Sequence, residues 1–175
     1  MLNLFARIVC VVLLFIGVLA LIGCFLPRAY DFQTEMKMKA APADIFPMVN
    51  TPRSWRDWSM WIPERIPDLK VESRGKDSGV GAEQFWTEVR GNGKMWITSS
   101  QPNERVDYEM VFQDFPRMES SISLQVEGDS TLVTWQSKGS LPSGPFFGYF
   151  AWLFPRQMEY QYQMSLENLK QLVEQ

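Results

Sequence analysis

Any acid–base chemistry in this chain has to come from carboxylates, tyrosines, lysines or arginines, because the 175 residues include no histidine. Ser-His and Cys-His nucleophile pairs are therefore excluded, and so are the commonest zinc and iron sites. The acidic residues are scattered, and most of them fall on the polar side of an alternating segment or beside a turn, as solvated surface residues do. We name no catalytic residue, expect no metal and no cofactor, and expect a binding role rather than an enzymatic one.

Two carboxylates and two tyrosines stand apart from this surface pattern. Glu83 and Glu88 fall on opposite faces of a predicted strand over residues 82–89, so one of them points towards the interior. A carboxylate placed there could act as a base. Tyr108 and Tyr162 fall on the inward faces of their elements, where each either hydrogen-bonds a ligand carbonyl or packs in the core.

Tryptophan is abundant, with seven in the chain. Trp55, Trp58 and Trp61 recur at a spacing of three, and their simplest role is to fill the space beneath two short helices. Trp135 most simply packs in the core of a sheet. The alternative is that some of these large, rigid rings line an apolar ligand cavity, where they would select ligands by shape.

The segment 146–154 contains six aromatic residues and no charge. It is either a short helix that packs its apolar side on the core, or a lid over a cavity mouth that dips into a membrane. Aromatic side chains favour the membrane interface, which supports the second alternative. The lid residues expected to face the membrane are Phe146, Phe147, Tyr149, Phe150 and Trp152.

The N-terminal segment 1–27 is predicted to be a membrane anchor. Residues 8–26 are an uncharged apolar run, which as a helix would be ~28 Å long, close to the ~30 Å hydrocarbon core of a bilayer. Arg7 and Arg28 flank the run, and Pro27 ends it. A single transmembrane helix is the simplest interpretation, although the flanking charges do not decide on which side of the membrane the remaining chain lies.

Two alternatives for this segment remain. A cleaved secretory signal is one, although no small-x-small cleavage site follows the run. A lipoprotein signal is the other, because residues 21–24 resemble a lipobox with Cys24 as the lipid acceptor. The chain stays apolar beyond Cys24, which argues against a lipoprotein.

Residues 28–175 are predicted to form one α+β domain. Strict alternation over 31–40 indicates a half-buried strand, and two short helical pieces follow, the second over 53–61. Further strands are predicted at 70–73, 82–89, 94–100, 106–112, 118–126 and 131–137, with a hairpin turn at 91–93. A final amphipathic helix runs from Pro155 to Val173.

Consecutive strands joined by short turns predict an antiparallel sheet of about six or seven strands. The long final helix is the element available to cover its apolar face. The result is a helix grip, in which a curved sheet wraps around the helix and tends to leave a hydrophobic cavity. The formal net charge of -3 gives no basic excess, so we expect no nucleic-acid partner.

This organisation resembles the START-like, or SRPBCC, superfamily and, within it, the polyketide cyclase/dehydrase branch. The resemblance spans 31–174, and it rests on the order and spacing of the stretches 41–46, 50–61, 79–82, 101–106, 128–135 and 166–170. It implies the helix-grip fold and a hydrophobic cavity, but no reaction, because carriers, cyclases and chaperone activators share the fold. An apolar N-terminal segment before such a domain also implies a bacterial inner-membrane protein.

The expected function is that of a membrane-tethered domain that binds a hydrophobic small molecule or lipid. The alternatives are an enzyme of the cyclase/dehydratase type and a protein-interaction module of the chaperone-activator type. The residues expected to line the cavity are Phe46, Trp55, Trp58, Phe85, Tyr108, Met110, Trp135, Phe150, Met158 and Tyr162.

Overall fold

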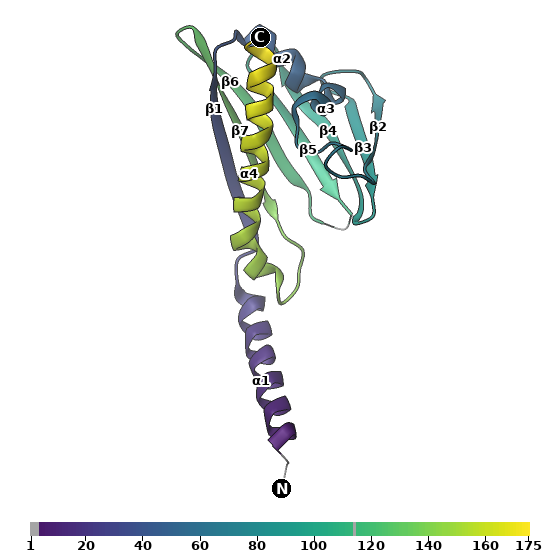
Figure 1. Ribbon diagram of the computed structural model, residues 1–175, viewed down its shortest axis with the longest axis vertical. Helices are drawn as coiled ribbons and strands as arrows, with labels where there is room; N and C mark the ends of the chain where they lie inside the picture. The colour runs from purple at the N-terminus through teal and green to yellow at the C-terminus, as the bar shows by residue number, and fades with distance from the viewer. Residues whose placement is uncertain (1–3, 114) are drawn as a thin grey trace.

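The computed structural model describes residues 4–113 and 115–175, and it shows a seven-stranded sheet packed against a long helix (Figure 1). The strands are β1 (Ala29–Met38), β2 (Lys70–Gly75), β3 (Ala82–Glu88), β4 (Gly91–Gln101), β5 (Arg105–Phe112), β6 (Met118–Glu127) and β7 (Ser130–Ser140). The helices are α1 (Leu4–Phe25), α2 (Pro42–Asn50), the 3-10 helix η1 (Pro52–Ser54), α3 (Trp55–Trp58) and α4 (Phe147–Val173).

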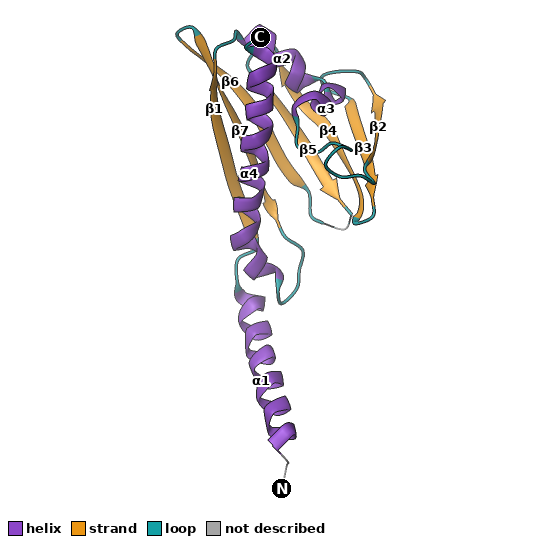
Figure 2. Ribbon diagram, in the orientation of Figure 1, coloured by secondary structure: helices purple, strands orange, loops and turns teal. Residues whose placement is uncertain are grey.

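The sheet is antiparallel throughout and has the order β1-β7-β6-β5-β4-β3-β2. Strands β2 to β7 form a meander, and β1 pairs with β7 at one edge. Helices α2, α3 and α4 lie on one side of this sheet (Figure 2). The predicted α+β helix-grip fold is therefore confirmed, with two short helices after the first strand and the long helix at the C-terminus.

Alternating burial shows which face of the sheet points inwards. In β1 every second residue from Tyr30 to Met38 is buried, and α4 packs along this strand. Leu166 and Leu169 of α4 are fully buried, which removes each side chain from water and stabilises the fold by ~1.5–3 kcal/mol per residue. Asn168 of α4 donates to the Trp58 carbonyl oxygen at 3.1 Å and so connects α4 to α3.

Helix α4 begins earlier than predicted. We expected it to start at Pro155, because proline is favoured in the first turn, but it starts at Phe147 and Pro155 lies inside it. A proline inside a helix removes one backbone hydrogen bond. Contacts of the preceding turns offset this loss: the Phe154 ring packs 4.9 Å from that of Tyr30, and Gly148 is buried against Leu26.

The hairpin between β3 and β4 also differs from the prediction. Residues 91–93 were expected to form the turn, but they are the first residues of β4, and the turn consists of Val89 and Arg90. Gly91 follows it with φ at 144°, a conformation that favours glycine. Glycine is therefore needed immediately after the turn rather than within it.

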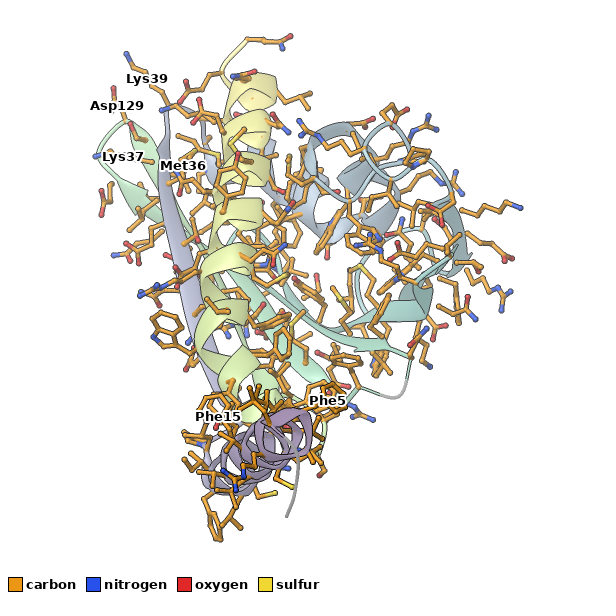
Figure 3. All side chains as sticks on the ribbon, turned by 60° about the horizontal axis from the view of Figure 1, so that its bottom comes forward. Phe5, Phe15, Met36, Lys37, Lys39 and Asp129 are labelled. Atoms are coloured by element: carbon orange, nitrogen blue, oxygen red, sulfur yellow. The ribbon has the colours of Figure 1, made fainter. Side chains whose placement is uncertain are left out.

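Helix α1 extends away from the sheet (Figure 1), and its apolar side chains are mostly exposed. It is the one helix in the described part of the chain that is long and apolar enough to cross a membrane, a property that signal sequences share. It begins at Leu4, four residues before the start of the predicted span, and ends at Phe25, one residue before the end of that span. In Figure 3, Phe5 and Phe15 project from α1, whereas Lys37, Lys39 and Asp129 lie at the far end of the sheet.

One end of the sheet lies next to α1, and we call it the proximal end. Strands β1, β4 and β6 begin there, strands β3, β5 and β7 end there, and α4 begins there. The chain passes from α1 directly into β1, and the Arg28 carbonyl oxygen accepts a hydrogen bond from the Leu141 backbone N–H at 2.9 Å. The β1 edge of the proximal end and the start of α4 are therefore next to the apolar helix.

Candidate functional site

Five of the predicted cavity residues meet in the centre of the grip. Trp55 and Trp58 come from α3, Tyr108 from β5, Trp135 from β7 and Tyr162 from α4, and all five are buried. Their ring centroids lie 5.0 Å apart for Trp55 and Tyr108, 5.4 Å for Trp58 and Trp135, and 3.8 Å for the stacked Trp135 and Tyr162. The rings fill the centre by packing against one another.

A buried hydrogen-bond network accompanies this aromatic centre. The Trp135 indole N–H donates to the Tyr108 hydroxyl oxygen at 2.8 Å. The Ser137 hydroxyl lies 2.6 Å from that of Ser120 and 2.7 Å from that of Tyr162. Burial raises the pKa of both tyrosines above the usual range, and for Tyr162 the nearby Tyr108 raises it further. Both phenols are therefore neutral at physiological pH and act as hydrogen-bonding groups rather than bases.

The other five predicted cavity residues are spread more widely. Phe46, Met110 and Met158 are half-buried and pack against the core. Phe85 lies on the outer face, where the guanidinium of Arg74 is 4.4 Å from its ring centroid, because the β3 residues facing inwards are the even-numbered ones. The fifth residue, Phe150, is exposed near the start of α4.

Phe146 caps α4, and the other four predicted lid residues lie in its first two turns. The five residues divide into two groups. Phe146, Phe150 and Trp152 are 47%, 58% and 65% exposed, so they project away from the core. Phe150, also predicted to line the cavity, therefore points outside it. Phe147 turns inwards, and the Tyr149 hydroxyl donates to the Leu19 carbonyl oxygen in α1 at 2.8 Å.

Helix α1 meets α4 through a pair of buried glycines. A Cβ atom added to Gly23 would lie 1.6 Å from the Pro145 carbonyl oxygen, and one added to Gly148 would lie 2.4 Å from the Leu26 Cβ. Only residues without a side chain allow this close approach. The junction places the exposed aromatic residues of α4 next to the end of the apolar helix.

At the proximal end, three half-buried phenylalanines connect the β5–β6 loop to α4. The ring centroids of Phe112 and Phe115 are 6.1 Å apart, and those of Phe115 and Phe147 are 6.2 Å apart. We call Phe112, Phe115 and Phe147 the proximal aromatic cluster. Phe112 and Phe115 were not predicted to line the cavity, although the position of Phe112 in the alternating strand 106–112 was a usable signal.

Two polar side chains on the inner face of β3 are buried at the same end. The Glu88 side chain is 1% exposed, and its Oε2 accepts from Arg90 Nη2 at 2.8 Å. Of the two carboxylates considered for an inward position, Glu88 is thus the one that faces the interior. Trp86, which was not nominated, is buried beside it. Trp86 and Glu88 alternate with outward residues along β3 and share its inner face. The register of β3 therefore determines whether both side chains point inwards or outwards.

A hollow of about 370 Å³ lies on the outer face of the sheet, away from these residues. Its lining is polar, and Tyr108 is the one predicted cavity residue that borders it. The carboxylates there have partners: Asp107 pairs with Arg105 at 2.7 Å, and Glu119 pairs with Lys138 at 3.1 Å. In the described part of the chain, no group of three or more potential ligands is arranged to hold a metal ion.

Solved structures confirm the fold through similarities below 25% identity. A protein of Chromobacterium violaceum is 17% identical, with a TM-score of 0.62, and the match covers 83% of this chain and 99% of that chain. The Aha1 dimer from Colwellia psychrerythraea is 18% identical, with a TM-score of 0.59, and the match covers 82% and 96%. The protein Ara h 8.0201 is 14% identical, with a TM-score of 0.56, and the match covers 83% and 97%.

No curated protein matches the sequence. The family model described as polyketide cyclase / dehydrase and lipid transport matches residues 30–174, which are the sheet and all the helices that pack on it. The chain therefore belongs to the polyketide cyclase/dehydrase and lipid transport family of the START-like fold.

Proposed function

We propose that residues 1–27 anchor the chain in a membrane and that residues 28–175 form a domain that binds a hydrophobic small molecule or a lipid inside the helix grip. The observation that carries this proposal is the position of the proximal end. Its exposed aromatic residues, at the start of α4, adjoin α1, whose length of ~33 Å suits a bilayer. The family description includes lipid transport, which supports the same function.

The proximal end also supplies apolar surface for a ligand. The proximal aromatic cluster is half-buried. Met110, two residues before Phe112 on the same face of β5, and Phe154, which packs against Tyr30, are half-buried as well. The aromatic centre is packed, so a ligand enters from the proximal end and displaces rings of the cluster. Because that end adjoins the anchor, a ligand dissolved in the membrane reaches the grip without crossing bulk water.

The exposed residues of α4 complete this arrangement. Phe146, Phe150 and Trp152 lie at the membrane interface, and the Arg156 guanidinium, 4.3 Å from the centre of the Trp152 ring, lies among the lipid headgroups. The start of α4 thus acts as a lid that faces the bilayer. The other two predicted lid residues, Phe147 and Tyr149, hold this segment to the cluster and to α1, respectively.

Native mass spectrometry of the full chain, extracted from membranes in a mild nonionic detergent, tests the binding. We expect one apolar adduct per chain, which organic extraction releases for identification. The bare mass, together with no uptake from a total lipid extract, would contradict the proposal. That result would favour a protein-interaction module, with the exposed start of α4 as its docking surface.

The buried Glu88 carboxylate favours one second candidate, an enzyme of the cyclase/dehydratase type with Glu88 as the base. In this case the extracted molecule would differ chemically from the one supplied. Incubating the full chain with each lipid fraction that it takes up, and comparing the supplied with the recovered molecules by chromatography and mass spectrometry, distinguishes the two functions. A carrier returns the ligand unchanged.

A further inference from the structure

Two polar atoms on the inner face of β3 are buried and have no hydrogen-bond partner among the described residues. They are Oε1 of Glu88 and Nε1 of Trp86. The Glu88 side chain is 1% exposed, and Trp86 is 5% exposed, so bulk water does not reach either atom. Buried polar atoms in folded proteins nearly always have a partner, so an atom without one calls for an explanation such as strain, an ordered water or a bound molecule.

Both atoms lie at the proximal end and over the same neighbouring strand. Glu88 pairs with Gly91 and Trp86 pairs with Gly93. The Gln113 side chain lies over Gly91, whereas Gly93 lies against the Trp86 ring. A Cβ atom added to Gly93 would lie 2.4 Å from Cε2 of Trp86, the carbon that bears Nε1. The indole N–H therefore lies against β4, and Phe112 of the proximal aromatic cluster is the partner of Gly93 in β5.

The chemistry of the two atoms restricts what can satisfy them. Glu88 Oε1 accepts a hydrogen bond, and Trp86 Nε1 donates one. A hydroxyl group can do both at once, whereas an ammonium group only donates and a carboxylate or phosphate only accepts. Arg90, whose Nη2 is 2.8 Å from Glu88 Oε2, already balances the charge of Glu88, so no cationic ligand is required.

We propose that Trp86 and Glu88 bind the hydroxyl group of a neutral lipid alcohol, whose apolar body lies against the proximal aromatic cluster. This assignment rests on the proposed function, because it identifies the ligand class of the same grip. The location agrees with the chemistry of a membrane-dissolved alcohol, whose hydroxyl group lies at the bilayer interface. Val89, at the tip of the adjoining hairpin, is an exposed apolar residue at the same end of the sheet.

The test measures binding of four probes of equal chain length to the full chain in nonionic detergent. The probes are tetradecanol, its methyl ether, tetradecanoic acid and tetradecylamine, each competing against radiolabelled tetradecanol. The ether accepts from Trp86 but cannot donate to Glu88. We expect tetradecanol to bind about tenfold more tightly than each of the other three, the effect of one buried hydrogen bond lost.

Two variants distinguish a loss of the hydroxyl site from a loss of the folded structure. Trp86→Phe keeps a ring over Gly93 and removes the N–H, and we expect it to weaken tetradecanol binding about tenfold. Trp96→Phe is the matched control, because Trp96 lies on the outer face, 4.6 Å from the Lys94 ammonium, and we expect no change. Thermal melting in the same detergent shows whether both variants remain folded.

A third variant, Glu88→Leu, removes the acceptor. We expect it to abolish the preference for the alcohol over the ether while binding of the ether persists. Equal binding of the alcohol and the acid, or no effect of Trp86→Phe, would overturn the hydroxyl site and leave the proposed function standing. Failure of all four probes to bind the wild-type chain would overturn both.

Discussion

At the scale of single residues, the interior of the grip depends on polar groups satisfied in a dry environment. Trp135 and Tyr162 stack, and their polar atoms connect to Tyr108 and Ser137 by hydrogen bonds. Within the described chain, Trp86 Nε1 and Glu88 Oε1 are the buried side-chain atoms that lack such partners. The centre of the grip therefore satisfies its own polar groups, whereas the proximal end contains two unpartnered polar atoms.

The buried tyrosines make stability depend on alkaline pH. Burial raises the pKa of Tyr30 to about 12, and Tyr162 nearby adds to the effect; the pKa values of Tyr108 and Tyr162 are also raised. An unfolded tyrosine ionises near pH 10, so above that pH the unfolded state binds fewer protons than the folded state. The stabilisation is complete below about pH 10 and is lost as the pH rises towards 12.

We therefore expect the free energy of unfolding of the full chain in detergent to fall between pH 10 and pH 12. The slope is up to ~1.4 kcal/mol per pH unit for each buried tyrosine. Urea titrations at half-unit intervals of pH measure it, and Tyr30→Phe should make the slope shallower. A slope that is the same in Tyr30→Phe and in the wild type would show that Tyr30 ionises no differently in the folded chain.

At the scale of elements, the junction between α1 and α4 determines how the apolar helix meets the grip. Gly23 and Gly148 allow the backbones to approach, and the Tyr149 hydroxyl reaches the Leu19 carbonyl oxygen. Gly17 lies in the same helix, and a Cβ atom added there would meet nothing within 4 Å. The two α1 glycines thus provide a matched test of the junction.

We expect Gly23→Ala to separate α1 from α4, because its Cβ would lie against the Pro145 carbonyl oxygen, and Gly17→Ala to leave the junction intact. Trypsin cleavage after Arg28, in the connection to β1, measures the difference in detergent micelles. Cleavage should be several-fold faster in Gly23→Ala than in the wild type or in Gly17→Ala. Equal rates in all three chains would mean that the connection does not depend on this contact.

The sequence was sufficient to predict most elements, because alternation in strands such as β1 and β5 is a local signal. The start of α4 was mispredicted because Pro155 has a strong local preference that contacts with Tyr30, distant in sequence, override. The β3–β4 turn was misplaced for a similar reason, since Gly91-Asn92-Gly93 resembles a turn until the pairing of Gly91 with Glu88 is known.

The candidate site was less predictable than the fold. Trp55, Trp58, Tyr108, Trp135 and Tyr162 were nominated together and do lie together, since each falls on an inward face. Whether they contact a ligand stays a prediction. The inward position of Trp86 and the outward position of Phe85 depend on strand register, which a short strand alone does not reveal.

At the scale of the whole molecule, the exposed apolar helix α1 adjoins the start of α4 beyond one end of the sheet (Figure 1). Strand β3, which carries the two unpartnered polar atoms, ends at the same end of the sheet, nearer the opposite edge. The opposite end carries Lys37, Lys39 and Asp129 (Figure 3). This polarity accounts for how a tethered carrier would exchange an apolar ligand with a bilayer. The central claim is therefore geometric: the proximal end of the grip faces the membrane.

The most direct measurement of this claim is the membrane depth of α4 in the full chain reconstituted into vesicles. Spin labels replace Phe150 in one sample and Gln163 in another, both exposed residues of α4, after both native cysteines are changed to serine. The rates at which each spin label collides with oxygen and with a water-soluble nickel chelate give the depth of that label in the bilayer. We predict that the label at 150 lies at the headgroup–acyl boundary and the label at 163 in water. Two labels equally accessible to the nickel chelate would contradict the account.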